Sequence, residues 1–303
     1  MILTITLSPC IDKSSSAARF EPEIKIRCTP LVYEPGGGGI NVSKALKKLG
    51  VEAKAIFPAG GHNGNMLCAL LEETGIAFER IDCSAETREN WVMLQTADNA
   101  QYRFNFPGQL TDIKTIDILI GRIADAHAGF VVASGSLPEG LPENTYAKIV
   151  AAANAAGAAC IVDTSGKALA ALKGCGAFLI KPNAGELSAL LGLGKLDKED
   201  VPAAARQLIA ANYAANVAVS MGATGAWLVS AEESFFCAAP AVKKLSTVGA
   251  GDSMVAGMVY KLQQKASMPD VLKFGVACGT AATMHAGTKL FEREDAEDLF
   301  AKM

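Results

Sequence analysis

The stretch Ser246-Thr-Val-Gly-Ala-Gly-Asp-Ser-Met254 places small residues directly before one aspartate, and the sequence after it has the spacing of an amphipathic helix. Glycines before a helix let backbone N–H groups converge on one point without obstruction by side chains. The N-terminus of the helix adds roughly half a positive charge there. We therefore expect the N–H groups of Gly249, Ala250 and Gly251 to form an anion site. Asp252 could accept a proton from a hydroxyl beside the bound anion, which suits phosphoryl transfer to an alcohol, or it could serve only the helix dipole.

Three further motifs carry glycines or oxygen ligands at the ends of predicted elements. Glu34-Pro-Gly-Gly-Gly-Gly-Ile-Asn41 opens another helix and permits close approach of the backbone, although it could be only a flexible loop. Ser220-Met-Gly-Ala-Thr-Gly225 follows a strand and could be a turn that ends it. Lys181-Pro-Asn-Ala-Gly-Glu186 offers an amide and a carboxylate, which suit Mg²⁺ but could also cap a helix. A P-loop and a dinucleotide fingerprint after the first strand are both missing, which excludes P-loop enzymes and weakens a nicotinamide dehydrogenase interpretation.

Composition narrows the class of protein. The chain has 303 residues, of which 50% are hydrophobic and 19% charged, so it is globular rather than disordered. The net charge of −3, without a basic block, gives no reason to expect nucleic acid or an anionic membrane as a partner. No run of 18 apolar residues predicts a membrane span. The eight scattered cysteines favour free thiols in a reducing cytoplasm, and the three separated histidines make a zinc site improbable.

Short apolar runs alternate with segments of helical period, which predicts a parallel α/β sheet covered by helices. The predicted strands are Ile2–Leu7, Ala53–Phe57, Phe130–Ser134, Cys160–Asp163, Phe178–Lys181 and Val217–Ser220. The predicted helices are Ile40–Leu49, Gly64–Thr74, Asn144–Ala155, Val201–Ala211, Asp252–Gln263 and Pro269–His285.

Two segments interrupt this alternation. Cys10–Pro35 is polar and extended, and Glu89–Phe106 has the pattern of a hairpin that turns at Ala97–Ala100. We expect a small sheet that projects from a single domain of residues 1–303 and covers a site or pairs with a second copy.

These motifs together resemble the ribokinase-like (PfkB) carbohydrate kinases over the whole chain, and among them the type II ATP-dependent 6-phosphofructokinases. The resemblance rests on LSPCID, KIRCTP, EPGGGGINVSKAL, IFPAGG, QYRF, SGSLPEG, IVDTSGKAL, KPNAGEL and STVGAGDSM. The related 1-phosphofructokinases and tagatose-6-phosphate kinases usually have lysine at the position of Gly38. The resemblance implies a three-layer α/β/α fold with a mainly parallel central sheet and a projecting β-sheet lid, formed by residues at about 10–35 and 89–106.

The resemblance also implies roles for individual residues. Asp252 would be the catalytic base, and Gly249, Ala250 and Gly251 would form the anion hole. The implied sugar-phosphate ligands are Asp12, Lys25, Arg27, Gly37, Gly38, Asn41, Arg88, Arg103 and Ser136, of which the four cations could instead be surface charges. The implied nucleotide ligands are Lys181, Asn183, Ser220, Gly222, Gly225, Val276 and Thr280. Asn183 and Glu186 would organise Mg²⁺, largely through water. Ser246 and Val248 would contribute to a K⁺ site, where His285-Ala-Gly-Thr-Lys289 departs from the usual Asn-x-Gly-Thr-Arg.

The function that the resemblance implies is ATP-dependent phosphorylation of fructose 6-phosphate at its 1-hydroxyl, in a cytoplasmic homodimer paired through the lid strands. A kinase for tagatose 6-phosphate or fructose 1-phosphate is the nearest alternative. A sensor that binds nucleotide or sugar phosphate without catalysis is the alternative from another class.

Overall fold

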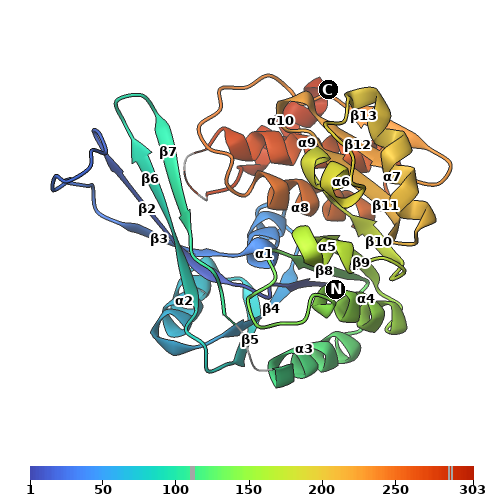
Figure 1. The fold of residues 1–303 in the computed structure, drawn as a ribbon, viewed down its shortest axis with the longest axis horizontal. Coiled ribbons are helices and arrows are strands. Elements are labelled where there is room, and N and C mark those ends of the chain that lie inside the picture. Colours follow the sequence, from blue (N-terminus) through green and yellow to red (C-terminus); the bar gives the residue numbers. More distant parts are fainter. Residues whose placement is uncertain (110–112, 286, 288) are drawn as a thin grey trace.

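A computed structural model describes residues 1–109, 113–285, 287 and 289–303 and shows two sheets, one large and one small (Figure 1). The large sheet contains β1 (Ile2–Ile5), β4 (Ala53–Ala59), β5 (Ala77–Asp82), β8 (Phe130–Ser134), β9 (Ala159–Asp163), β10 (Ala177–Ile180), β11 (Ala214–Ser220), β12 (Ala226–Val229) and β13 (Ser234–Cys237). The small sheet contains β2 (Cys10–Ala17), β3 (Val32–Gly36), β6 (Arg88–Gln95) and β7 (Ala100–Asn105). The helices are α1 (Gly38–Lys48), α2 (Gly61–Thr74), α3 (Ile113–Asp125), α4 (Thr145–Ala155), α5 (Gly166–Ala170), α6 (Ala184–Leu190), η1 (Lys198–Asp200), α7 (Val201–Ala210), η2 (Gly222–Thr224), α8 (Ala250–Gln263), α9 (Met268–Thr283) and α10 (Arg293–Lys302).

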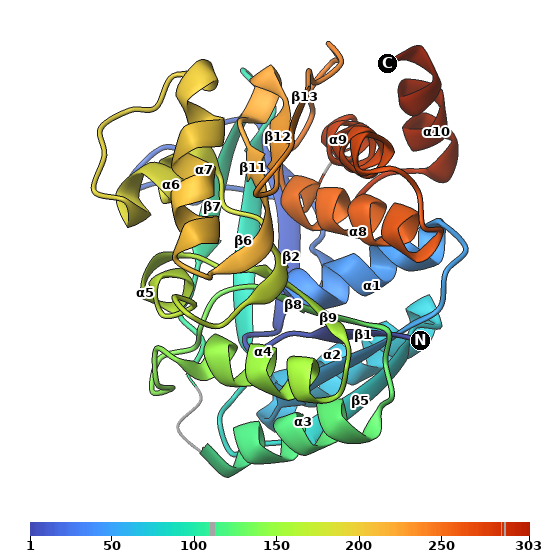
Figure 2. The ribbon, with the colours of Figure 1, turned by 90° about the vertical axis from the view of Figure 1, so that its right-hand side faces the viewer.

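The large sheet has the order β13-β12-β11-β10-β9-β8-β1-β4-β5, and its strands from β11 to β5 are parallel. Alternate residues of its strands enter different cores, because successive side chains point to opposite faces. Leu3 and Ile5 pack with α3 and α4, whereas Ile2 packs with α1 and α8. Figure 2 shows these helices on the two sides of the sheet. This burial on both faces explains why the strands are almost continuously apolar.

All six predicted strands and all six predicted helices are present, with ends that differ by up to three residues. Six further elements are present that were not predicted from the sequence: α3, α5, α10, β5, β12 and β13. Ile116, Leu119 and Ile123 of α3 are buried at helical spacing, so a signal for that helix was present. Among the described residues, no helix combines the length and the apolarity that a membrane span requires.

The small sheet has the order β3-β2-β6-β7 and projects beside the large one (Figure 1). The predicted hairpin is present as β6 and β7, paired antiparallel. Because side chains alternate along each strand, the register divides this sheet into two faces. One face carries Asp12 and Asn90, which are paired partners on β2 and β6. The opposite face carries Trp91 and Phe104, which are paired partners on β6 and β7.

Candidate active site

Asp252 lies in the first turn of α8, where three elements of the large body meet. Gly249, the N-cap residue, has a φ of 71°, a conformation that glycine adopts readily. The Nδ2 of Asn41 in α1 donates to Asp252 Oδ2 at 3.0 Å. The hydroxyl of Ser134, at the end of β8, donates to Asp252 Oδ1 at 3.2 Å. Asn41 was among the predicted site residues and Ser134 was not.

The surroundings of Asp252 make its carboxylate more basic than usual. Burial is the main cause and the charge of Asp163 the second, and together they raise the pKa of Asp252 to about 6. The hydrogen bonds from Asn41 and Ser134 and the charge of Lys181 act in the opposite direction. A carboxylate with this pKa is ionised at neutral pH and still accepts a proton readily, which is what a general base requires.

Lys181 stands beside the proposed anion hole. Its Nζ lies 3.1 Å from Asp163 Oδ1, and the two side chains are only 7% and 18% exposed. Burial alone would lower the pKa of Lys181, but the charges of Asp163 and Asp252 outweigh it and raise that pKa. A side chain at Gly251 would begin 3.5 Å from Lys181 Nζ, so the cation lies next to the backbone that precedes Asp252. Asp163 was not among the predicted site residues, although it ends the parallel strand β9, and ligands of α/β proteins bind at such strand ends.

A large cavity of about 680 Å³ opens between the turn at η2 and helices α8 and α9. Its lining includes five of the predicted nucleotide ligands, Ser220, Gly222, Gly225, Val276 and Thr280. Ala250 and Gly251 line it as well, so the cavity ends at the residues directly before Asp252. A cavity of this size and mainly apolar lining accommodates a molecule as large as a nucleotide.

The four-glycine segment brings the start of α1 into close contact with β8. Gly37, the N-cap residue of α1, has a φ of 111°. A Cβ atom at Gly38 would lie 2.3 Å from Ser134 Oγ and 2.7 Å from the backbone nitrogen of Gly135. The absence of a side chain at Gly38 therefore allows Ser134 and Asn41 to reach Asp252 together.

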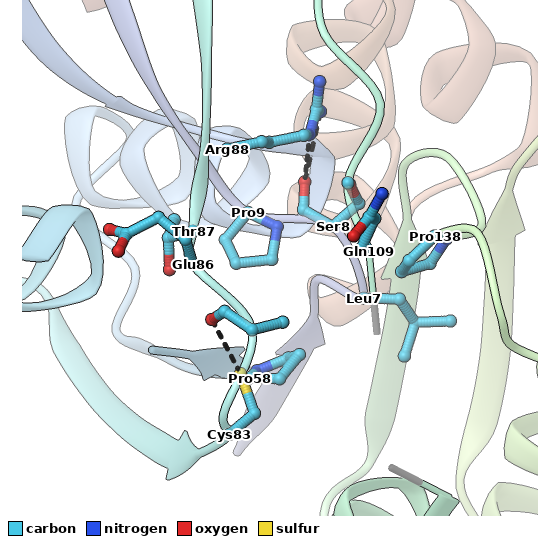
Figure 3. Close-up of a pocket in the computed structure, with 12 residues that line it drawn as sticks. Leu7, Ser8, Pro9, Pro58, Cys83, Glu86, Thr87, Arg88, Gln109 and Pro138 are labelled. Atoms are coloured by element: carbon cyan, nitrogen blue, oxygen red, sulfur yellow. Dashed lines mark hydrogen bonds between the residues drawn. The ribbon is translucent and has the colours of Figure 1, made fainter. Parts of the chain in front are cut away.

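Asp12 and Arg88 lie at the base of the small sheet. Asp12 is almost fully buried, and its pKa is raised by that burial in spite of hydrogen bonds from Asn90 and Cys10. Nε and NH2 of Arg88 donate to the carbonyl of Ser8 at 3.4 and 3.2 Å. Figure 3 shows this contact at the edge of a small cavity of about 20 Å³, which has room for a single water.

The predicted sugar-phosphate ligands Lys25, Arg27, Arg103 and Ser136 form no hydrogen bond with Asp252 among the described residues. Lys25 and Arg27 are exposed in the loop between β2 and β3 and form no hydrogen bond or ion pair with other described residues. Ser136 is also exposed, and its neighbour Ser134 makes the contact with Asp252 instead. Arg103 on β7 donates to Thr247 Oγ1 at 2.8 Å, so it lies at the rim of the large cavity.

The predicted metal ligands are placed as follows. Asn183 and Glu186 form a capping box at the start of α6, with two hydrogen bonds of 2.8 Å, so the alternative of helix capping applies to them. Within the described ranges, no cluster of three or more His, Cys, Asp or Glu side chains could hold a metal ion. The amide of Asn183 and the carboxylate of Glu186 are a donor set that fits Mg²⁺ held mainly by water and phosphate.

The predicted K⁺ site is a separate region. Ser246 is buried before α8, and its hydroxyl accepts from the backbone N–H of Val248. His285 pairs with Asp295, whereas Ala286 and Thr288 of the expected K⁺ loop lie outside the described residues.

Comparison with known proteins gives a consistent result over the full length. Residues 3–295 match the pfkB family of carbohydrate kinases. The chain is 40% identical to the ATP-dependent 6-phosphofructokinase isozyme 2 of Escherichia coli (strain K12), covering 99% of this chain and 98% of that protein. It is 35% identical to the 1-phosphofructokinase of Xanthomonas campestris pv. campestris, covering 88% and 85%. The crystal structure of phosphofructokinase-2 from Escherichia coli in complex with fructose-6-phosphate superposes with a TM-score of 0.93 at 39% identity, over 99% and 98% of the chains.

The expected ribokinase-like architecture, with a mostly parallel large sheet and a separate small sheet, is confirmed. On this match and this fold together, the chain belongs to the PfkB family of carbohydrate kinases.

Proposed function

We propose that this protein transfers the γ-phosphoryl group of ATP to the 1-hydroxyl of fructose 6-phosphate, as a cytoplasmic enzyme of glycolysis. The observation that carries the proposal is the position of Asp252. Its carboxylate contacts the glycine-bounded start of α1 on one side. On the other side, it directly follows two residues that line a cavity of nucleotide size. A sugar hydroxyl bound at the start of α1 and the triphosphate of a nucleotide bound in the large cavity would meet at this carboxylate.

The residues of the chain divide the work of the reaction. Asp252 removes the proton from the attacking hydroxyl, and the N–H groups of Gly249, Ala250 and Gly251 hold the oxygens of the phosphoryl group in transfer. Asp12 accepts hydrogen bonds from sugar hydroxyls, and Arg88 binds the phosphate of the sugar. Asn183 and Glu186 would hold Mg²⁺ through water, and the ion would neutralise charge on the ATP phosphates.

One observation favours fructose 6-phosphate over the alternative substrates within the family. A lysine at position 38, which the resemblance associates with kinases for fructose 1-phosphate and tagatose 6-phosphate, would require the Ser134–Gly135 backbone to move. Because Ser134 also donates a hydrogen bond to Asp252, a side chain at position 38 would disturb the proposed base, and glycine avoids this. The sensor alternative gives no reason for a carboxylate with a pKa near 6 at this place.

The test is a panel of sugar phosphates with ATP and Mg²⁺, with and without K⁺, followed by coupled ADP release. We expect kcat/KM for fructose 6-phosphate to exceed the values for tagatose 6-phosphate and fructose 1-phosphate by about tenfold or more. A higher kcat/KM for tagatose 6-phosphate or fructose 1-phosphate would assign the protein to the kinases for that sugar phosphate within the same family. Absence of ADP release with every sugar would support the sensor.

We also propose that two copies pair through the small sheet. Trp91 and Phe104 are 39% and 48% exposed and lie side by side on one face of that sheet. Tyr102 extends the same face and is also exposed. β7 is an edge strand of the sheet as well. An exposed aromatic face beside an unpaired edge is typical of a protein interface.

Replacing Phe104 with glutamate is expected to convert the dimer to a monomer, because the pairing would bury an unpaired charge. Light scattering at micromolar concentration measures the mass. Leu193→Glu is the matched control, because Leu193 is 43% exposed but lies in the loop after α6. A wild-type mass of 31.5 kDa at that concentration would end the dimer proposal.

A further inference from the structure

We propose that Asn90 is a positioning residue for the sugar phosphate, because its side chain ties the carboxylate of Asp12 to the guanidinium of Arg88. Nδ2 of Asn90 donates to Asp12 Oδ1 at 3.0 Å. NH1 of Arg88 donates to Asn90 Oδ1 at 2.8 Å. This inference rests on the proposed function, since it assigns Asp12 to the hydroxyls of the sugar and Arg88 to its phosphate.

The orientation of the Asn90 amide follows from the chemistry of its neighbours. An ionised aspartate only accepts hydrogen bonds, and an arginine only donates them. An uncharged amide both donates and accepts, so it satisfies both neighbours at once, with its nitrogen toward Asp12 and its oxygen toward Arg88. The parallel register of β2 and β6 makes this possible, because Asp12 pairs with Asn90 while Arg88 precedes it by two residues on the same face.

The contacts of Asp12 leave one of its oxygens for a ligand. Oδ1 accepts from Asn90 and also from the thiol of Cys10, at 3.3 Å. Oδ2 has no hydrogen-bond partner among the described residues. It lies against Gly36, where a Cβ atom would come within 2.2 Å of it. Two donors on Oδ1 therefore fix the rotation of the carboxylate and direct Oδ2 to the space that the glycine leaves open.

Arg88 is fixed in a comparable way. The carbonyls of Ser8 and Phe106 accept from its guanidinium, in addition to Asn90 (Figure 3 shows the contact with Ser8). Backbone carbonyls at two sites, before β2 and after β7, hold the guanidinium, and Asn90 connects it to Asp12. The distance between the hydroxyl-binding carboxylate and the phosphate-binding cation is thus set before the ligand arrives, which lowers the cost of ordering the site.

Replacing Asn90 with leucine, which has a similar shape and no polar atoms, tests this role. We expect the Kd for fructose 6-phosphate and its KM to rise about tenfold or more, because two hydrogen bonds to charged groups are lost. The KM for ATP should change less than about twofold, because Asn90 does not line the large cavity. Calorimetric titration with fructose 6-phosphate and steady-state assays give the two readouts, and Asn90→Ala repeats them if the leucine variant does not fold.

Asn105→Leu is the matched control, because Asn105 is the paired partner of Asn90 on β7 and is exposed. A double-mutant cycle with Arg88→Ala separates positioning from a general loss of stability. The effect of Arg88→Ala on KM should be several-fold smaller in the Asn90→Leu background. An unchanged Kd in the Asn90 variants, or single effects that simply multiply, would overturn the inference while an active wild type keeps the proposed function. A wild type that neither binds nor phosphorylates fructose 6-phosphate would overturn both.

Discussion

Replacing Asp252 with asparagine is expected to lower kcat by at least about 100-fold, the lower end of the loss for a general base. Asparagine keeps the shape of the side chain: its single amide oxygen can accept from Asn41 Nδ2, and its NH2 group can donate to the hydroxyl of Ser134, which donates to Asp252 in the wild type. It cannot take up the proton of the sugar hydroxyl. The ADP-release assay with fructose 6-phosphate measures the loss, and a kcat within about tenfold of wild type would contradict the role of Asp252.

The matched control is Asp270→Asn. Asp270 also lies in the first turn of a long helix, α9, where its carboxylate accepts from the hydroxyl of Ser267 at 2.7 Å. It therefore has the helix-dipole role that was the alternative for Asp252. Near wild-type kcat for the Asp270 variant and a large loss for the Asp252 variant would distinguish the base from a residue that only stabilises a helix.

The same variant, Asp252→Asn, is expected to lose activity but to gain stability against unfolding at alkaline pH. The pKa of Asp252 is about 6 in the folded protein against an ordinary value of 3.8. The folded state therefore binds protons more tightly, and ionisation of Asp252 above about pH 6 costs about 3 kcal/mol of stability. Asp252→Asn should melt at a higher temperature than wild type at pH 8, and this advantage should disappear as the pH falls from about 6 to 4. Thermal unfolding at both pH values measures it.

The parts of the fold and site that the sequence predicts are those with a local signal. Strands buried on both faces have no polar interruption, and glycines beside a helix start have few other uses. Asp252 and the glycines Gly222, Gly225 and Gly251 of the large cavity were accessible in this way. Ser134, Asp163 and Asn90 were not, because each is a single polar residue in or at the end of a strand. The order of the strands and the register of the small sheet bring Ser134 to Asp252 and Asn90 to Asp12, and the two residues of each pair are more than 75 positions apart.

Lys25 and Arg27 were predicted from a sequence motif, but the sequence does not determine where their side chains lie. The motif that contains them supports the family assignment, but the conformation of a long exposed loop depends on what packs against it. Both side chains are exposed and form no hydrogen bond or ion pair with other described residues, so their contribution to phosphate binding stays a prediction.

Replacing Lys181 with methionine is expected to destabilise the protein and to displace the pH dependence of catalysis. Lys181 and Asp163 form an ion pair that is largely removed from solvent. Removing one partner leaves an uncompensated charge, which costs about 3 kcal/mol or more. Urea unfolding measures this loss. Lys167→Met is the matched control, because Lys167 pairs with Glu143 at 2.9 Å but is 83% exposed, and the cost there should stay below about 1 kcal/mol.

The pH dependence of kcat/KM tests whether Lys181 acts on Asp252, which a loss of stability alone cannot show. In the wild type, kcat/KM should fall with acid below about pH 6, because protonated Asp252 cannot act as a base. The charge of Lys181 lowers the pKa of Asp252, and the charge of Asp163 raises it. Without the lysine, Asp252 faces the unneutralised carboxylate of Asp163, so its pKa should rise and the acid limb of the profile should move to higher pH. Measuring kcat/KM between pH 5 and 9 for wild type, Lys181→Met and Lys167→Met decides the point. An acid limb at the same pH in all three would show that Lys181 does not act on the base.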